Sequence, residues 1–139
     1  MRYDLLQLLD YALHAAKAAG VEILKIYASG KMDVTHKGDG SPVTNADLRA
    51  QDTINKLLQA SGLPVLSEEA KVPFEQRSSW QQFWLVDPLD GTKDFIAHNN
   101  EFTVNIALIE NGIPVIGVVA APALNRTWYA SSGAGAWQN

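Results

Sequence analysis

The chain has 139 residues, of which 47% are apolar and 19% charged, with a formal net charge of −4 and no cysteine. This size and balance predict one globular domain. The negative charge and the lack of any Lys/Arg cluster exclude a nucleic-acid-coating surface, and the missing cysteines exclude disulfides and thiolate metal sites. The sequence contains no run of 18 apolar residues that would predict a membrane span, so we expect a cytoplasmic protein. The sequence leaves peripheral membrane association open.

A long amphipathic helix is predicted from Asp4 to about residue 27. Apolar residues recur there at helical spacing, and Asp4 can cap the helix with Gln7 reaching back three residues later. Gly20 inside this helix either marks close packing or weakens the helix by about 1 kcal/mol. The following polar stretch, 28–42, predicts a loop with a short edge strand at 32–35.

A second helix is predicted from Thr44 to Ser61-Gly62. Thr44 caps it, and Asp47 stands at its third helical position as a capping-box variant. Capping and the helix dipole are enough to explain Asp47 on physical grounds. The buried stripe of this helix is predicted to consist of Leu48, Ile54, Leu57 and Leu58.

The rest of the chain predicts a sheet. Short apolar or alternating runs bounded by turn signals indicate strands at 63–66, 83–86, 102–109, 113–121 and 126–130. The run 113–121 is nearly all apolar, so we expect it to be covered on both faces. Because the turns between neighbouring strands are too short for crossovers, the fold class is α+β, with two long helices packed on an antiparallel sheet.

The most informative stretch follows the strand at 83–86 and reads Asp87-Pro88-Leu89-Asp90-Gly91-Thr92. Two carboxylates three residues apart, with a backbone carbonyl turned inward between them, suit Mg²⁺ better than zinc. Gly91 and Thr92 offer backbone N–H groups and a hydroxyl to a phosphate oxygen. This combination predicts a metal-dependent phosphatase.

Turn chemistry alone is the competing interpretation, because Asp-Pro and Asp-Gly are common turn dipeptides. It does not explain a second acidic pair, Glu68-Glu69, at the end of another strand, and one of these residues is a candidate third carboxylate. Lys37 and Lys93 are expected to be solvated by residue type, although Lys93 stands beside Thr92, where a phosphate could pair with it.

The six residues 87–92 resemble the first signature of the lithium-sensitive, Mg²⁺-dependent phosphatases typified by inositol monophosphatase. The segments 41–47, 93–95 and 101–109 are most similar to the bacterial 3′(2′),5′-bisphosphate nucleotidases of that family, which act in sulfur assimilation. The resemblance implies the first half of a layered αβαβα fold. It also implies hydrolysis of the 3′-phosphate of adenosine 3′,5′-bisphosphate to AMP, with a small phosphorylated substrate and no nucleic-acid partner.

The resemblance assigns roles to individual residues. It implies that Glu68, Asp87, the Leu89 carbonyl and Asp90 bind Mg²⁺, and that Gly91, Thr92 and Lys93 hold the substrate phosphate. Asp47 and Thr92 would deprotonate the attacking water, with Glu68 as a further catalytic group and Glu69 in the outer shell or at an additional metal. An aspartyl-phosphate mechanism is excluded, because Pro88 stands where that class needs an acid.

Members of this family are considerably longer. We therefore expect residues 1–139 to form the amino-terminal metal-binding domain, without the carboxy-terminal domain that supplies another aspartate ligand and much of the substrate pocket. Exposed strand edges in such a form predict self-association. Two alternatives remain open: an inositol monophosphatase-type enzyme, and an inactive metal-binding fragment.

Overall fold

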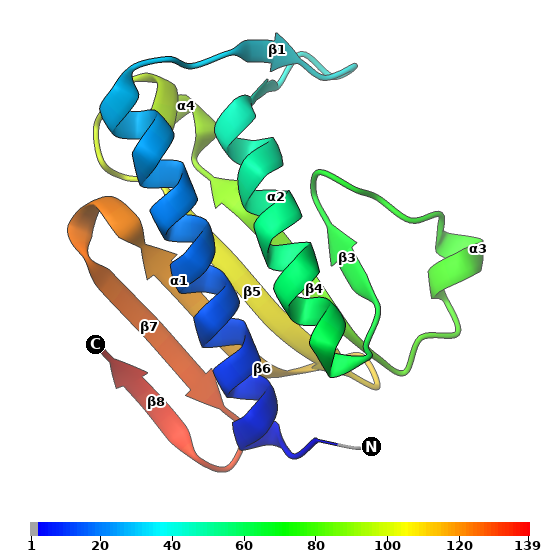
Figure 1. The fold of residues 1–139 in the computed structure, drawn as a ribbon. Helices are drawn as coiled ribbons and strands as arrows, with labels where there is room; N and C mark the ends of the chain where they lie inside the picture. The colour runs from blue at the N-terminus through cyan, green and yellow to red at the C-terminus, as the bar shows by residue number, and fades with distance from the viewer. Residues whose placement is uncertain (1–2) are drawn as a thin grey trace.

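The computed structural model describes residues 3–139 as two layers, a pair of helices on a six-stranded sheet (Figure 1). The helices are α1 (Leu5–Ser29), α2 (Asn45–Leu58), α3 (Phe74–Arg77) and α4 (Thr92–Ile96), with 3-10 turns η1 (Gln59–Ser61) and η2 (Pro122–Leu124). The strands are β1 (Val34–His36), β2 (Pro42–Thr44), β3 (Val65–Ser67), β4 (Gln82–Asp90), β5 (Thr103–Glu110), β6 (Ile113–Ala121), β7 (Arg126–Ser131) and β8 (Gly135–Gln138). The α+β fold class is confirmed.

Helix α1 begins as its sequence predicts. The Asp4 side chain accepts from the Gln7 amide and the Gln7 side chain accepts from the Asp4 amide, both at 2.9 Å, which completes a capping box. Gly20 serves close packing, because a Cβ added there would lie 3.1 Å from Pro122 Cβ. At Gly20, helix α1 therefore lies directly against η2, the turn that follows β6.

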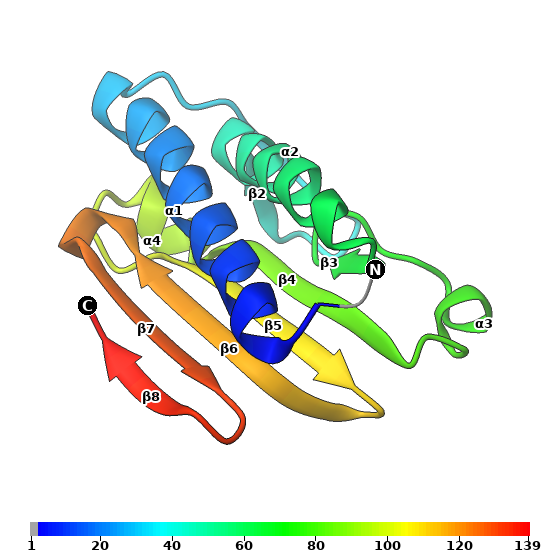
Figure 2. The same ribbon diagram turned by 60° about the horizontal axis from the view of Figure 1, so that its bottom comes forward.

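Helix α2 lies beside α1 on the same face of the sheet, as Figures 1 and 2 both show. Thr44 is its cap as predicted, but the predicted stripe is wrong at Leu48, which is 55% exposed. The buried face consists of Ala46, Asp47, Ala50, Ile54 and Leu58. The apolar members of this face follow one another at four-residue spacing, as one stripe of a helix requires.

The sheet has the strand order β3-β4-β5-β6-β7-β8, and its neighbours are antiparallel except for β3 and β4, which are parallel. The excursion that contains α3 supplies the long connection that a parallel pair needs. The apolar run at 83–86 extends into the nine-residue strand β4, and β8 is a strand that the sequence pattern did not predict.

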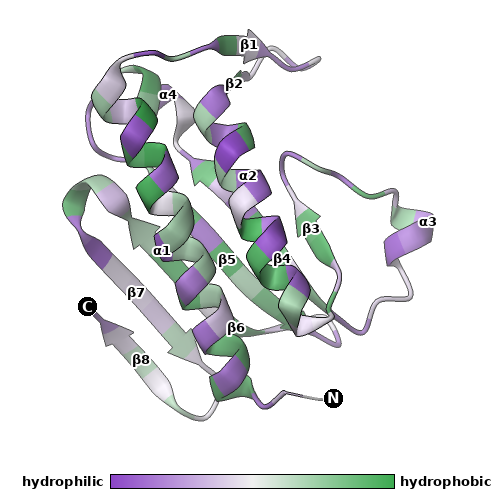
Figure 3. Cartoon of the chain, viewed as in Figure 1, coloured by the Kyte–Doolittle hydropathy of each residue, from purple (hydrophilic) through white to green (hydrophobic). Residues whose placement is uncertain are grey.

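Only one face of the sheet is covered by the described residues. Figure 2 shows α1 and α2 together on that face, and Figure 3 shows hydrophobic and hydrophilic residues alternating along both helices. On the opposite face Leu85 is 44% exposed and Val119 38% exposed. The prediction that 113–121 is covered on both faces is therefore wrong for residues 3–139. None of the described helices has the length and apolarity needed to cross a membrane.

Candidate active site

An irregularity in β4 presents the two aspartates of the acidic turn. Asp87 pairs with Asn105 of β5 and Asp90 with Thr103, so four residues of β4 face three of β5. Pro88 lies in this bulge, where its lack of an N–H breaks no ladder bond. The bulge turns the end of β4 away from regular pairing, and the Asn105 amide donates to the Asp90 carboxylate at 3.1 Å.

The parallel pairing of β3 with β4 brings the second acidic pair to the same place. Ser67 lies opposite Val86, and the Glu68 amide donates to the Val86 carbonyl at 3.1 Å. Glu68 and Asp87 therefore leave adjacent strand ends. An open cavity of about 370 Å³ lies between the two turns and a polar hairpin, and it is lined by Lys37, Ser41, Pro42, Glu68, Glu69, Asp87, Leu89, Asp90, Gly91, Thr92, Lys93 and Asp94.

Carboxylates outnumber ammonium groups in the lining of this cavity. Burial and, after it, the charges of Asp90, Glu68 and Glu69 raise the pKa of Asp87 from 3.8 to about 6, with partial relief from the Leu89 backbone amide. Carboxylates that repel one another in this way are stabilised by a cation placed between them.

Helix α2 reaches the acidic turn through Asp47, which is fully buried. Its Oδ2 accepts from the Thr44 amide at 2.8 Å and the Thr44 hydroxyl at 2.6 Å, and its Oδ1 accepts from the Thr92 hydroxyl at 2.9 Å. Asp47 therefore does more than cap a helix. It connects α2 to the first residue of α4, 45 positions further along the chain.

Gly91 is required by the geometry of this turn. Its φ is +83°, and a Cβ at this position would lie 3.1 Å from the Glu101 carbonyl oxygen and 3.1 Å from Asp94 Oδ2. A left-handed backbone that lies against another backbone segment admits glycine alone without displacement. Gly91, Thr92 and Lys93 all line the cavity, with Lys93 exposed.

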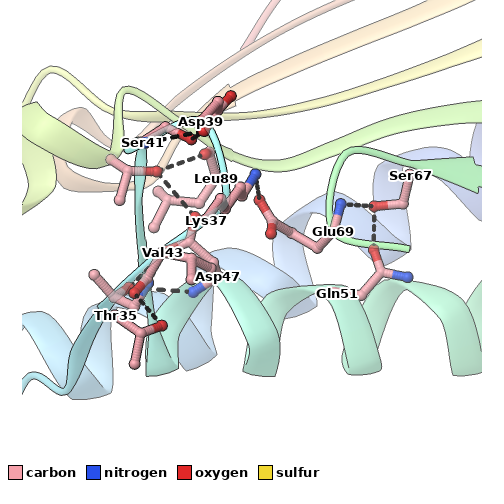
Figure 4. A network of polar contacts seen from close by, with 12 residues as sticks. Thr35, Lys37, Asp39, Ser41, Val43, Asp47, Gln51, Ser67, Glu69 and Leu89 are labelled. Carbon is pink, nitrogen blue, oxygen red and sulfur yellow. Dashed lines mark hydrogen bonds and ion pairs between the residues drawn. The ribbon is translucent and has the colours of Figure 1, made fainter. Parts of the chain in front are cut away.

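Lys37 is not solvated as its residue type predicts. Its ammonium lies 3.1 Å from Glu69 Oε1, and Figure 4 shows this pair joining the segment that follows β1 to the turn after β3. The Glu69 side chain is 7% exposed. Burial alone would lower the pKa of Lys37, but the hydrogen bond and charge of Glu69, with Glu68 and Asp47, raise it above its ordinary value.

The donor set fits a hard divalent cation in chemistry. Every candidate ligand offers oxygen: the carboxylates of Glu68, Asp87 and Asp90 and the carbonyl of Leu89. Among residues 3–139, however, no three carboxylate or imidazole side chains converge closely enough to form a complete site. The described residues therefore supply part of a coordination shell.

Asn105 and Lys37 contact the acidic groups but were not predicted to do so. Asn105 had one usable signal, an amide between the apolar residues of a strand. Lys37 had none, because it lies 32 positions from Glu69 in a loop.

Comparison with known proteins covers nearly the whole chain. The model of the inositol monophosphatase family matches residues 4–139. The chain is 50% identical over 134 residues to the 3′(2′),5′-bisphosphate nucleotidase CysQ of Shigella flexneri, a match that covers 94% of this chain and 54% of the relative. The chain spans about half the length of the curated relatives it matches.

Two solved structures show the same fold. CysQ from Bacteroides thetaiotaomicron superposes with a TM-score of 0.86 at 44% identity, covering 96% of this chain and 49% of that one. An inositol monophosphatase from Thermotoga maritima superposes with a TM-score of 0.84 at 31% identity, covering 96% and 51%. With its acidic strand ends, its Gly-Thr turn and a family match from residue 4 onward, the chain belongs to the inositol monophosphatase family.

Proposed function

We propose that this chain supplies the metal- and phosphate-binding part of a Mg²⁺-dependent phosphatase that removes the 3′-phosphate of adenosine 3′,5′-bisphosphate and leaves AMP. The observation that carries the proposal is the single cavity that Glu68, Asp87 and Asp90 line together with Thr92. We also propose that residues 1–139 form the amino-terminal metal-binding domain of such an enzyme, in keeping with relatives about twice as long.

Glu68, Asp87, Asp90 and the Leu89 carbonyl would hold the metal. Bound Mg²⁺ would lower the pKa of a coordinated water and stabilise the charge that develops on the leaving oxygen. The acidic residues alone would repel a phosphate ester, so substrate binding by this cavity depends on cations. Lys93, on the same wall, would pair with the substrate phosphate through its ammonium.

Thr92 and Asp47 would move the proton. The Thr92 hydroxyl has one hydrogen, and its bond to Asp47 Oδ1 at 2.9 Å is shorter than its contact with the Leu89 carbonyl at 3.3 Å. As the hydroxyl passes this hydrogen to Asp47 Oδ1, the oxygen of Thr92 would take up a proton from a water in the cavity. Thr92 would then be a neutral hydroxyl again, and Asp47 would carry the proton. Thr44 holds the other oxygen of Asp47 and so fixes the direction of this relay.

The substrate class rests on the relatives. Curated relatives named as 3′(2′),5′-bisphosphate nucleotidases are up to 50% identical to this chain, whereas the inositol monophosphatase of Thermotoga maritima is 31% identical. The test is phosphate release with Mg²⁺ from adenosine 3′,5′-bisphosphate and from inositol 1-phosphate, assayed side by side. Preference for the inositol ester would contradict the proposed substrate.

A second candidate function is a metal-binding fragment without turnover. It is favoured by the lack of a complete three-ligand cluster among the described residues. Calorimetric titration of the 139-residue chain with Mg²⁺ or Mn²⁺ separates the two: tight binding together with turnover rejects the fragment, and weak binding without turnover supports it. Self-association, tested by light scattering, and the cytoplasmic location stay predictions.

A further inference from the structure

Helix α2 carries a second polar side chain that reaches an acidic turn. Gln51 follows Asp47 by four residues, so the two lie on one face of the helix, about 6 Å apart along its axis. Asp47 accepts from Thr92 at the Asp87–Thr92 turn, and Gln51 Oε1 accepts from the hydroxyl of Ser67, just before Glu68. One rigid helix therefore touches both turns.

Ser67 passes this contact on to the acidic pair. Its side chain is 2% exposed, and its hydroxyl oxygen accepts from the Glu69 amide at 3.2 Å while donating to Gln51 (Figure 4). The register of β3 on β4 already fixes the Glu68 amide on the Val86 carbonyl. After Glu68 the chain is held by two further bonds to Ser67: the Ala70 amide donates to its carbonyl at 3.2 Å, and the Glu69 amide donates to its hydroxyl. Of these two bonds, only the one to the hydroxyl depends on the side chain of Ser67.

We propose that Gln51 and Ser67 are positioning residues: their hydrogen bond holds the Glu68-Glu69 turn beside the Asp87–Asp90 turn, so that carboxylates of both turns can face one divalent cation. The metal arm of this inference rests on the proposed function. Gln51 is 16 positions from Ser67, and neither residue lines the cavity, so both act through the carboxylates that they orient.

The experiment compares Gln51→Leu, Ser67→Ala, the double variant and the control Ser61→Ala. Ser61 is also a buried serine contacted by α2, since it donates to the Leu58 carbonyl and accepts from Trp84 Nε1 at 2.9 Å. It lies at the far end of α2 from the cavity, so its loss lowers the urea midpoint of unfolding without touching the acidic turns.

The first readout needs no metal. Amide hydrogen exchange at Glu68 and Glu69 is measured by NMR in EDTA. The rate at Glu69 divided by the rate at Glu68 reports the hydrogen bond of the Glu69 amide, and the Glu68 amide is the internal reference. We expect the ratio to rise in Gln51→Leu and further in Ser67→Ala, with no additional rise in the double variant. Ser61→Ala leaves the ratio at the wild-type value. An unchanged ratio in Gln51→Leu overturns the inference.

The second readout is Mn²⁺ binding, with free Mn²⁺ counted by electron paramagnetic resonance. We expect Ser67→Ala and the double variant to bind Mn²⁺ about 10-fold more weakly than wild type, in the range usual for residues that orient metal ligands, and Ser61→Ala to bind normally. If Ser61→Ala weakens Mn²⁺ binding as much as Ser67→Ala does, general destabilisation explains the lower affinity and the inference is overturned. If the wild-type chain binds no Mn²⁺, the proposed metal-dependent function fails, and the exchange ratio still decides whether Gln51 holds the turn.

Discussion

Replacing Asp87 by asparagine should stabilise the metal-free protein. Asparagine keeps the shape of the side chain and an oxygen that can accept from the Leu89 amide, but it removes one charge from the acidic cavity. In the folded protein burial and the neighbouring carboxylates raise the pKa of Asp87 from 3.8 to about 6. Ionised Asp87 therefore costs the folded state free energy that a neutral asparagine side chain would not.

The size of this cost follows from the pKa. The full difference between 3.8 and about 6 corresponds to about 3 kcal/mol, and because Asp87 is half-buried, solvent screening reduces it to about 1–2 kcal/mol. The sign is that of an acid whose pKa rises on folding. The stability that protonated Asp87 gives the folded protein, relative to ionised Asp87, is complete below pH 3.8. It declines as the pH rises toward about 6 and is absent above that value.

Urea unfolding followed by the fluorescence of the four tryptophans measures the effect. In EDTA at about pH 7.5 we expect the midpoint of Asp87→Asn to exceed that of wild type by roughly 0.5–1 M, and the difference to vanish near pH 3.5. Asp52→Asn is the matched control, because Asp52 is exposed and pairs with Lys56 on the surface of α2, at 3.0 Å, so its midpoint should not move.

Excess Mn²⁺ should reverse the order of stability, since only wild type would bind it. The reasoning is refuted if Asp87→Asn is less stable than wild type in EDTA at neutral pH, or if the difference between them does not change with pH.

Three further predictions concern the same cavity. Asp90→Asn should abolish Mn²⁺ binding in a calorimetric titration and any phosphate release, and near-normal rates would contradict its role as a ligand. Thr92→Val should lower the rate of phosphate release about 100-fold or more while leaving Mn²⁺ affinity unchanged, because it removes the hydroxyl that relays a proton to Asp47 and removes no proposed metal ligand. Lys37→Met should destabilise the chain in EDTA by about 1–3 kcal/mol in urea unfolding, since Glu69 would lose the partner that compensates its burial, and an unchanged midpoint would show the ion pair to be neutral.

Local signals predicted where the two long helices begin. The capping pairs Asp4–Gln7 and Thr44–Asp47 each span three residues, so their hydrogen bonds depend only on the chain between them. The buried face of α2 was predicted less well. Leu48 has the stronger apolar signal, but it is 55% exposed, while Ala46 and Ala50 are buried. Which side of α2 is buried depends on how the helix lies in the fold, and side-chain apolarity alone does not give that orientation.

In the sheet, too, local sequence predicted the elements and packing decided how they are arranged. Period-2 alternation and turn residues indicated most strands, but not the parallel pairing of β3 with β4, because the connection at 68–81 lacks the periodicity of a crossover helix. The apolar run of β6 predicted cover on both faces. Composition reports how much apolar surface a strand carries, while the neighbouring elements decide how much of it they bury.

The sequence by itself determined the acidic turn. Asp87, Asp90 and Thr92 lie within six consecutive residues, so their spacing and chemistry can be interpreted without knowing the fold. Only the tertiary structure decided which groups surround that turn: Glu68 beside Asp87 through the register of β3, Asp47 against Thr92 through α2, and Lys37 on Glu69 through the hairpin. These contacts join residues up to 45 positions apart, and their geometry depends on how helices and strands pack, which no local pattern encodes.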